Sequence, residues 1–277
     1  MTVQKSTRYH HILPDMIRSL WAYRWFILGS VQREFQSRYR GSLLGAAWPV
    51  ISPLAMIVVY LTVFSHLMKA RLPGLTDTMA YGIFLCVGIF TWGYFVEVLN
   101  RCINIFIENA NLLKKSPFPK ASLPLIALLS ATLNFAIVFG IFLIFLLITF
   151  RFPGPILLAM IPLLIIQQIL AVGLGVLLGT LNVFFRDVGQ VMTIVIQFWF
   201  WLTPIVYPPS VLPEWIRNLV LTWNPMAQLI AGYQGILLTG AMPDYAAYWP
   251  PTLLALLTFV VGYWTFKRLS GEMVDEL

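Results

Sequence analysis

The sequence predicts an all-α integral membrane protein with six transmembrane helices. Hydrophobic residues make up 59% of the 277 positions and charged residues 10%, which is too little polar surface to cover a soluble globule of this size. Long uncharged segments recur, and the first covers 28 residues between Arg40 and Lys69. A helix needs only about 20 residues to cross the hydrocarbon core of a bilayer. Lysine and arginine residues lie beside these segments, as expected for cytoplasmic flanks.

The chain before the first span predicts an amphipathic helix in the membrane interface, over residues 12–36. Apolar residues recur there at roughly helical spacing, and Trp21, Arg18 and Arg24 lie among them. The first span is predicted at 43–68. Because three arginines directly precede it, we expect this end of the chain to lie in the cytoplasm.

Five further spans are predicted by uncharged stretches at residues 79–105, 121–150, 156–184, 190–206 and 248–266. A polar segment at 107–119 separates the second and third spans and should hold a short cytoplasmic helix stopped by prolines. Residues 207–247 are rich in Gly, Pro, Asn and Gln, which suits a lipid-facing helix poorly. We expect one or two short helices there that enter the membrane partway from outside, against protein or a watery cavity.

The basic residues support this topology. With six spans and both termini inside, 14 of the 18 Lys and Arg residues are cytoplasmic and four are external. The net charge of +7 is therefore explained by membrane orientation, and we expect no nucleic-acid partner.

The sequence offers no energy source of its own for transport. It lacks the G-x-x-x-x-G-K-[ST] loop that cradles a nucleotide triphosphate. An ion-coupled transporter needs carboxylates or histidines within its spans, but Glu97 is followed one helical turn later by Arg101 and should be neutralised by it. An integral-membrane enzyme is opposed by the lack of a carboxylate, His or Cys cluster at membrane depth, and we expect neither a catalytic nor a metal site.

The polar segment at 107–119 has the form of a docking element for a separate ATPase subunit. Apolar side chains stand there beside charged ones on a short helix held between two spans. The candidate coupling residues are Glu108, Asn111, Leu112, Leu113, Lys114 and Lys115. The alternative is an ordinary solvated loop.

Four segments in order carry a resemblance to a known family. They are RYRGSLLGAAWPVISPL (38–54), NLLKKSPFP (111–119), FRDVGQV (185–191) and WNPMAQLIAGYQGILLTG (223–240). Together they resemble the membrane subunit of ABC-2-type polysaccharide exporters, most closely O-antigen permeases, with capsule and teichoic-acid exporters as relatives. The resemblance covers nearly the whole chain.

The resemblance implies a multi-pass permease of the bacterial inner membrane that works as a homodimer with two copies of a cytoplasmic ATPase. ATP and magnesium would be bound by that partner, and no cofactor by this chain. The cargo would be an undecaprenyl-diphosphate-linked polysaccharide; a smaller lipid or a drug is the alternative. The resemblance also implies an external gate between spans five and six, for which the candidates are Asn224, Pro225, Gln228 and Tyr233.

Two further groups of residues are candidate contacts for such a cargo. Flat aromatic faces let sugar C–H surfaces slide without fixed charges, and the candidate channel-lining residues are Tyr60, Phe64, Phe198, Trp201 and Tyr207. Ordinary packing or an interfacial aromatic belt explains such residues equally well. Arg38 and Arg40 are suited to contact the lipid diphosphate, or they act only as topology signals.

Overall fold

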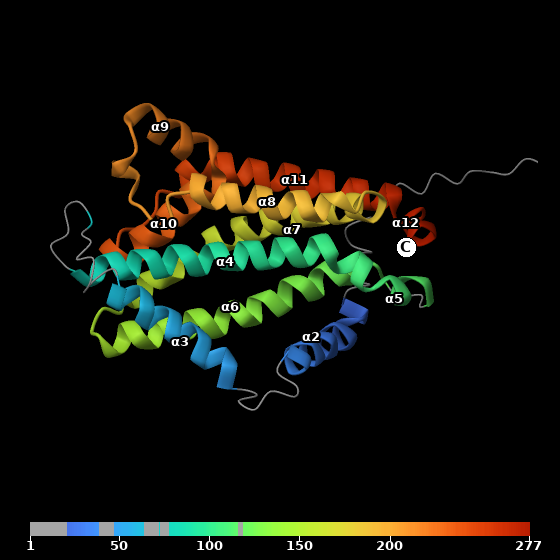
Figure 1. Cartoon of the computed structure of the whole chain (residues 1–277), viewed down its shortest axis with the longest axis horizontal. Coiled ribbons are helices and arrows are strands. Elements are labelled where there is room, and N and C mark those ends of the chain that lie inside the picture. Colours follow the sequence, from blue (N-terminus) through green and yellow to red (C-terminus); the bar gives the residue numbers. More distant parts are fainter. Residues whose placement is uncertain (1–20, 39–46, 64–71, 73–77, 116–118) are drawn as a thin grey trace, which may run out of the picture.

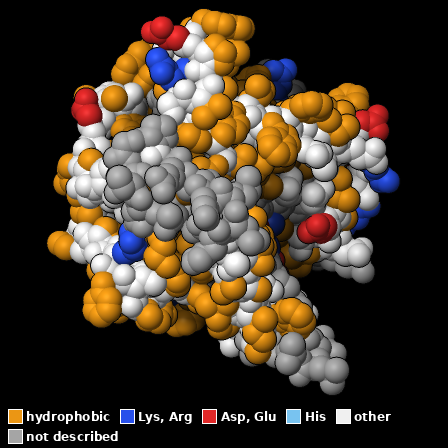
Figure 2. Space-filling model, turned by 60° about the vertical axis from the view of Figure 1, so that its left-hand side comes forward, with side chains coloured by type: hydrophobic (Ala, Val, Ile, Leu, Met, Phe, Trp, Pro, Cys, Tyr) orange, Lys and Arg blue, Asp and Glu red, His pale blue; other side chains and the backbone are white. Residues whose placement is uncertain are grey.

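The computed structural model describes residues 21–38, 47–63, 72, 78–115 and 119–277, and within these ranges every regular element is helical. Four helical stretches are long and apolar enough to cross a membrane: Met79–Glu108, Ser122–Ile148, Gly154–Phe184 and Tyr245–Leu269. Hydrophobic side chains cover much of the described surface seen in Figure 2. These observations support a multi-pass membrane protein.

The long helices run roughly side by side along the longest axis of the molecule (Figure 1). They are α4 (Thr78–Glu108), α6 (Ser122–Ile148), α7 (Met160–Phe184) and α11 (Trp249–Leu269). Short 3-10 helices, Gly154–Ala159 and Tyr245–Tyr248, precede α7 and α11. The short helices α5 (Ala110–Lys115) and α12 (Met273–Glu276) lie at one end of the bundle, and α9 (Glu214–Trp223) lies at the other.

Helix α4 lies at the centre of the core. It contacts α6, α7 and α10 (Pro225–Thr239), and 78% of its most apolar stretch is buried. Small residues allow neighbours to approach closely: a Cβ added at Gly179 would clash with the carbonyl oxygen of Cys102. A Cβ at Gly173 would likewise lie 2.5 Å from the backbone nitrogen of Phe259, so α7 packs almost backbone to backbone on α11.

Two of the predicted spans correspond to shorter helices. Helix α3 (Trp48–Tyr60) continues as a π-helical turn to 63, and the rest of the predicted span at 43–68 lies outside the described residues. Helix α8 (Asp187–Leu202) replaces the predicted span at 190–206. It ends early because Pro204 forces Thr203 into an extended conformation, with φ −103° and ψ 129°. At 1.5 Å per residue α8 is about 24 Å long, less than the hydrocarbon core.

The interface helix is described from residue 21, and its regular part is α2 (Arg24–Arg38). Residues 12–20 of the predicted helix lie outside the described residues. Ile27 and Val31 are buried and α2 contacts α6, whereas Trp21 and Trp25 are about 70% exposed. A narrow apolar stripe therefore holds this helix on the bundle, with its tryptophans exposed.

The predicted helix at 107–119 is divided in the structure. Helix α4 continues through Glu108, and α5 begins only at Ala110. The backbone N–H groups of Leu112 and Leu113 both donate to the carbonyl oxygen of Asn109, at 3.0 Å, which starts the new helix. Within the described residues the candidate coupling helix therefore covers Ala110–Lys115 and is joined to α4 through a single residue, while residues 116–118 of the predicted helix lie outside the described residues.

The glycine- and proline-rich region after α8 forms two short helices, α9 and α10, joined at Asn224. The side chains of Leu229, Ile230 and Ile236 in α10 are fully buried. Helix α10 therefore belongs to the core, where neighbouring helices surround its irregular ends.

Candidate functional site

A shallow groove of about 480 Å³ lies between α4 and α8. Its walls combine large aromatic rings with uncharged polar groups, contributed by Trp92, Asn100, Thr193, Gln197, Phe200 and Trp201. No charged side chain of the described residues lines it. Such a surface can stack against apolar faces and exchange hydrogen bonds without holding a ligand by charge.

The α8 side of this groove is formed by residues spaced four positions apart on that helix. Thr193, Gln197 and Trp201 follow one another at intervals of four and so lie on one face of the helix. All three are exposed, and the side chain of Trp201 is 59% exposed. Thr193 and Gln197 have no sequence motif of their own, but this four-residue spacing was visible in the sequence.

The aromatic wall is held by ring contacts between α4 and α8. Phe200 lies with its ring centroid 5.9 Å from Trp92 and 5.4 Å from Trp201, at interplanar angles of 64° and 84°. Trp199 makes a similar edge contact with Trp92, at 5.8 Å. These edge-to-face contacts are favourable for aromatic pairs and orient Trp201 toward the groove side of α8.

The described members of the predicted channel-lining set lie in different parts of the structure. Phe198 is 67% exposed, and Tyr207 lies beyond the end of α8, where its hydroxyl donates to the carbonyl oxygen of Trp201 at 2.7 Å. Tyr60 lies on α3 and is partly buried against the core, away from the groove lining. Phe64 lies outside the described residues. Among the described members of this set, Trp201 alone lines the groove.

Asn224 connects the end of α8 to the start of α10. Its Oδ1 accepts hydrogen bonds from Trp199 Nε1 at 2.9 Å and from the backbone nitrogens of Met226 and Ala227, which caps α10. Its Nδ2 donates to Thr203 Oγ1 at 2.9 Å. Pro225 occupies the first position of α10, where its missing N–H costs nothing.

The other two candidate gate residues have unequal environments. Gln228 is only partly buried, and its Nε2 donates to the carbonyl oxygen of Thr222 at 3.0 Å. Tyr233 is fully buried, and its hydroxyl donates to Gln167 Oε1 at 2.9 Å; Gln167 in turn donates to the carbonyl oxygen of Thr91. Tyr233 therefore anchors α10 in the core.

A charged cluster joins three helices near the interface helix. The predicted pairing of Arg101 with Glu97 is confirmed, with Arg101 Nη2 2.9 Å from Glu97 Oε1. Arg101 also pairs with Glu34 of α2. On α6, Ser130 donates to Glu34 and Asn134 donates to Glu97, each at 2.7 Å. Sequence reasoning missed Glu34, because 67 positions separate it from Arg101.

The candidate coupling residues lie at the end of the bundle that carries α5 and α12. Glu108, Asn111 and Lys114 are exposed, Leu112 is half-buried and Leu113 is buried. The side chain of Lys115 lies outside the described set, as do Arg40 and the side chain of Arg38. Among the described residues, no three His, Cys, Asp or Glu side chains come together as a metal-binding group.

Comparison with known proteins identifies the family. The O-antigen export system permease protein RfbA of Myxococcus xanthus is 29% identical over 262 residues, covering 94% of this chain and 97% of that protein. An RfbA of Klebsiella pneumoniae is 29% identical over 246 residues, covering 88% and 92%. The polysialic acid transport protein KpsM of Escherichia coli is 20% identical over 245 residues, covering 88% and 93%. Residues 27–238 match the ABC-2 type transporter family, and the chain therefore belongs to the ABC-2 transporter membrane family.

Proposed function

We propose that this chain is the transmembrane subunit of an ABC transporter that exports a lipid-linked polysaccharide of O-antigen type across the inner membrane. The names of the relatives support a polysaccharide cargo. A capsule or teichoic-acid polymer, or a smaller lipid or drug, is the alternative cargo. The chain supplies the pathway, and a separate subunit hydrolyses ATP.

The groove between α4 and α8 is the observation that carries this proposal. A sugar ring has apolar C–H faces and many hydroxyls, so it can stack on Trp201 and Phe200 while exchanging hydrogen bonds with Gln197 and Asn100. Each contact is weak and none is ionic. A polymer can therefore pass along the surface one sugar after another.

The exposed face of α8 supports a homodimer. Ile194, Val195 and Phe198 are between 42% and 67% exposed, although they belong to an apolar helix too short to cross the bilayer alone. Two copies that face each other through this region would place both grooves around one central conduit. The same patch on each copy makes a symmetric interface of the commonest kind.

The ATPase subunits would bind at α5, one to each copy. Asn111 and Lys114 of α5 and Glu108 at the end of α4 are exposed, and α5 is held to the bundle by Leu113. ATP and magnesium would be bound by those partners. Because α5 joins α4 through Asn109, closure of the ATPases would pull on the helix that forms one wall of the groove.

Arg38 and Arg40 are proposed contacts for the lipid diphosphate at the inner leaflet, since guanidinium groups bind phosphate in a bidentate manner. Replacing both by Gln should reduce export while the permease still assembles. Unchanged export at normal protein levels would leave them a role in topology only.

The central experiment is complementation of a strain that lacks this gene. We expect the deletion to accumulate lipid-linked polymer on the cytoplasmic leaflet and the wild-type gene to restore surface polysaccharide. The double variant Trp201→Ala with Gln197→Ala should lower export at least fivefold, since one ring contact is worth about 1 kcal/mol.

The matched control is Trp264→Ala, which removes an exposed ring from α11, outside the groove. It should export normally. Equal loss in both variants would point to a general effect of tryptophan in the membrane. No polymer accumulation in the deletion strain would exclude a polysaccharide cargo.

A further inference from the structure

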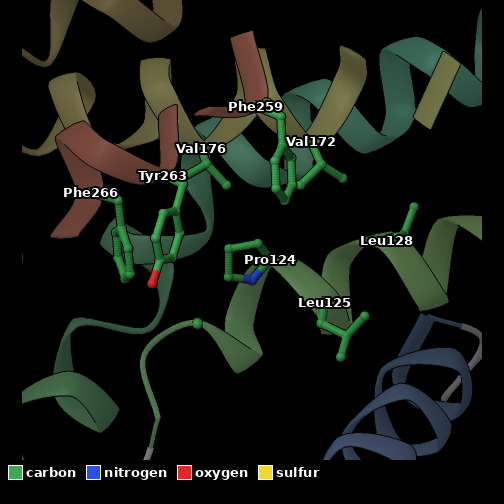
Figure 3. A pocket seen from close by; sticks show the side chains of 10 residues that line it. Pro124, Leu125, Leu128, Val172, Val176, Phe259, Tyr263 and Phe266 are labelled. Carbon is green, nitrogen blue, oxygen red and sulfur yellow. The ribbon is translucent and has the colours of Figure 1, made fainter. Parts of the chain in front are cut away.

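A second, apolar crevice of about 190 Å³ lies between α6, α7 and α11, on a different part of the bundle from the α4–α8 groove. Its walls are formed chiefly by Pro124, Leu128, Val172, Val176, Phe259 and Tyr263. Figure 3 shows Tyr263 and Phe266 side by side on α11, with Pro124 of α6 between the two helices. A cavity of ~150 Å³ with such walls stays dry and binds a benzene-sized group, so this crevice has room for a segment of hydrocarbon chain.

The crevice results from uneven packing of α11 on α7. At Gly173 and Gly262 the two backbones are nearly in contact, and a Cβ on Gly262 would lie 2.5 Å from the carbonyl oxygen of Gly173. The neighbouring Val172 and Val176 lie beside that contact and line the opening toward α6. Only 17% of the most apolar stretch of α11 and 28% of that of α6 are buried, which leaves apolar faces of both helices available to lipid.

One end of the crevice carries positive charge. Lys120 directly precedes the crevice residue Ala121, and its ammonium group donates to the carbonyl oxygen of Ser270, at the end of α11. Lys267 is exposed and stands one helical turn beyond Tyr263 on the same flank of α11. Among the described residues, no carboxylate forms an ion pair with either lysine.

We propose that this crevice binds one anionic membrane phospholipid, with an acyl chain between α6 and α11 and its phosphate at Lys120 and Lys267. Basic pockets between transmembrane helices recognise anionic headgroups in this way. Since lipid tails are as apolar as the crevice walls, the walls alone give little preference over bulk lipid. The lysines supply the selectivity, and the crevice orients the chain.

The occupant is a resident phospholipid and not the transported lipid. The crevice shares no lining residue with the α4–α8 groove. Its volume admits part of one acyl chain, whereas a long polyprenyl chain needs far more. The bound lipid would hold α11 against α6 where these two helices diverge.

Native mass spectrometry of the purified permease, released from nanodiscs that contain phosphatidylglycerol and phosphatidylcholine, tests the proposal. Wild-type protein should retain one phosphatidylglycerol per chain in preference to phosphatidylcholine. Lys267→Gln should weaken that retention about fivefold, the effect of one positive charge near a membrane surface. Lys267→Arg should retain it.

Two variants test the crevice itself. Val176→Phe fills it from α7, and Leu128→Trp narrows it from α6 in case the first variant folds poorly. Either should lower phosphatidylglycerol retention with both lysines still present. Arg186→Gln removes a positive charge at the same end of the bundle but away from the crevice, and it should have no effect.

Equal retention of the two lipids, or equal loss in Arg186→Gln and Lys267→Gln, would overturn the proposal. Normal retention in a folded crevice-filling variant would also overturn it. Displacement of the lipid by equimolar undecaprenyl phosphate would assign the crevice to the cargo. The assay contains neither ATPase nor polysaccharide, so its result is independent of the proposed export function.

Discussion

Helices α4 and α6 are both long membrane spans, yet they stand in opposite environments. In α4, 78% of the most apolar stretch is buried, against 28% in α6. The buried helix carries the charged residues Glu97 and Arg101, whereas α6 carries none between its ends. Lipid cannot satisfy a polar group, so in this protein charge is placed where other helices cover it.

The polar residues of α6 are likewise covered by neighbouring helices. Ser130 and Asn134 donate to carboxylates on α2 and α4, and Thr132 shares a hydrogen bond of 2.6 Å with Tyr94 of α4. Exposed residues of α6 such as Ile144 and Leu147 are apolar. The polar positions of this helix therefore mark sides that pack on protein, with Thr132 on a different side from Ser130 and Asn134.

The largest effect should come from removing the cation of the three-helix charge cluster. Arg101→Gln removes the cation that pairs with both Glu34 and Glu97 in a partly buried site, which should destabilise the protein by about 3 kcal/mol. Thermal unfolding in detergent would measure the loss. The triple variant that also carries Glu34→Gln and Glu97→Gln should recover most of it. A single variant as stable as wild type would mean that the cluster is not structural.

A smaller loss should follow from Tyr233→Phe. The substitution leaves the buried Gln167 Oε1 without its donor, at a cost of about 1 to 2 kcal/mol. Tyr207→Phe is the matched control, because that hydroxyl bonds a carbonyl oxygen at the surface. Unfolding temperatures of the two variants should therefore differ. Equal values would show that the α10 anchor contributes no more than a surface contact.

The smallest effect should be a gain in stability at Gln168 on α7. The nitrogen and oxygen of its side-chain amide are buried with no hydrogen-bond partner among the described residues. They differ in this from the buried charged groups of α4, which are paired. Gln168→Leu removes this cost and should raise stability by about 1 kcal/mol. The neighbouring Gln167→Leu breaks two hydrogen bonds and should do the reverse. A loss at Gln168 in thermal unfolding would indicate an unseen partner for its amide.

Local chemistry was sufficient to predict several features. The four-residue spacing of Glu97 and Arg101 predicted their ion pair, and the helix break near the prolines predicted a short element at α5. The exact ends of the helices were harder to predict. Helix α8, for example, ends at Leu202 because Thr203 precedes Pro204. The proline restricts only the residue before it, whereas the predicted bounds of the span rested on the hydropathy of a long stretch of sequence.

The residues that line the candidate groove could not all be predicted from local sequence. Trp201 was predicted from its aromatic ring and Gln197 was not, although the two share a face of α8. Trp92 and Asn100 lie about 100 positions earlier, on α4. Nothing in their own neighbourhood distinguishes them from other span residues. Only the packing of α8 on α4 joins the four.

The amino-acid sequence by itself determined the membrane location, the approximate positions of four long spans and the family, because hydropathy and local motifs act over short stretches of chain. Tertiary structure alone decided that Glu34 completes the charge cluster, that Tyr233 is buried and that α6 and α11 leave a crevice on α7. These features join residues that lie far apart in the chain. Their partners depend on which face each helix turns toward its neighbours.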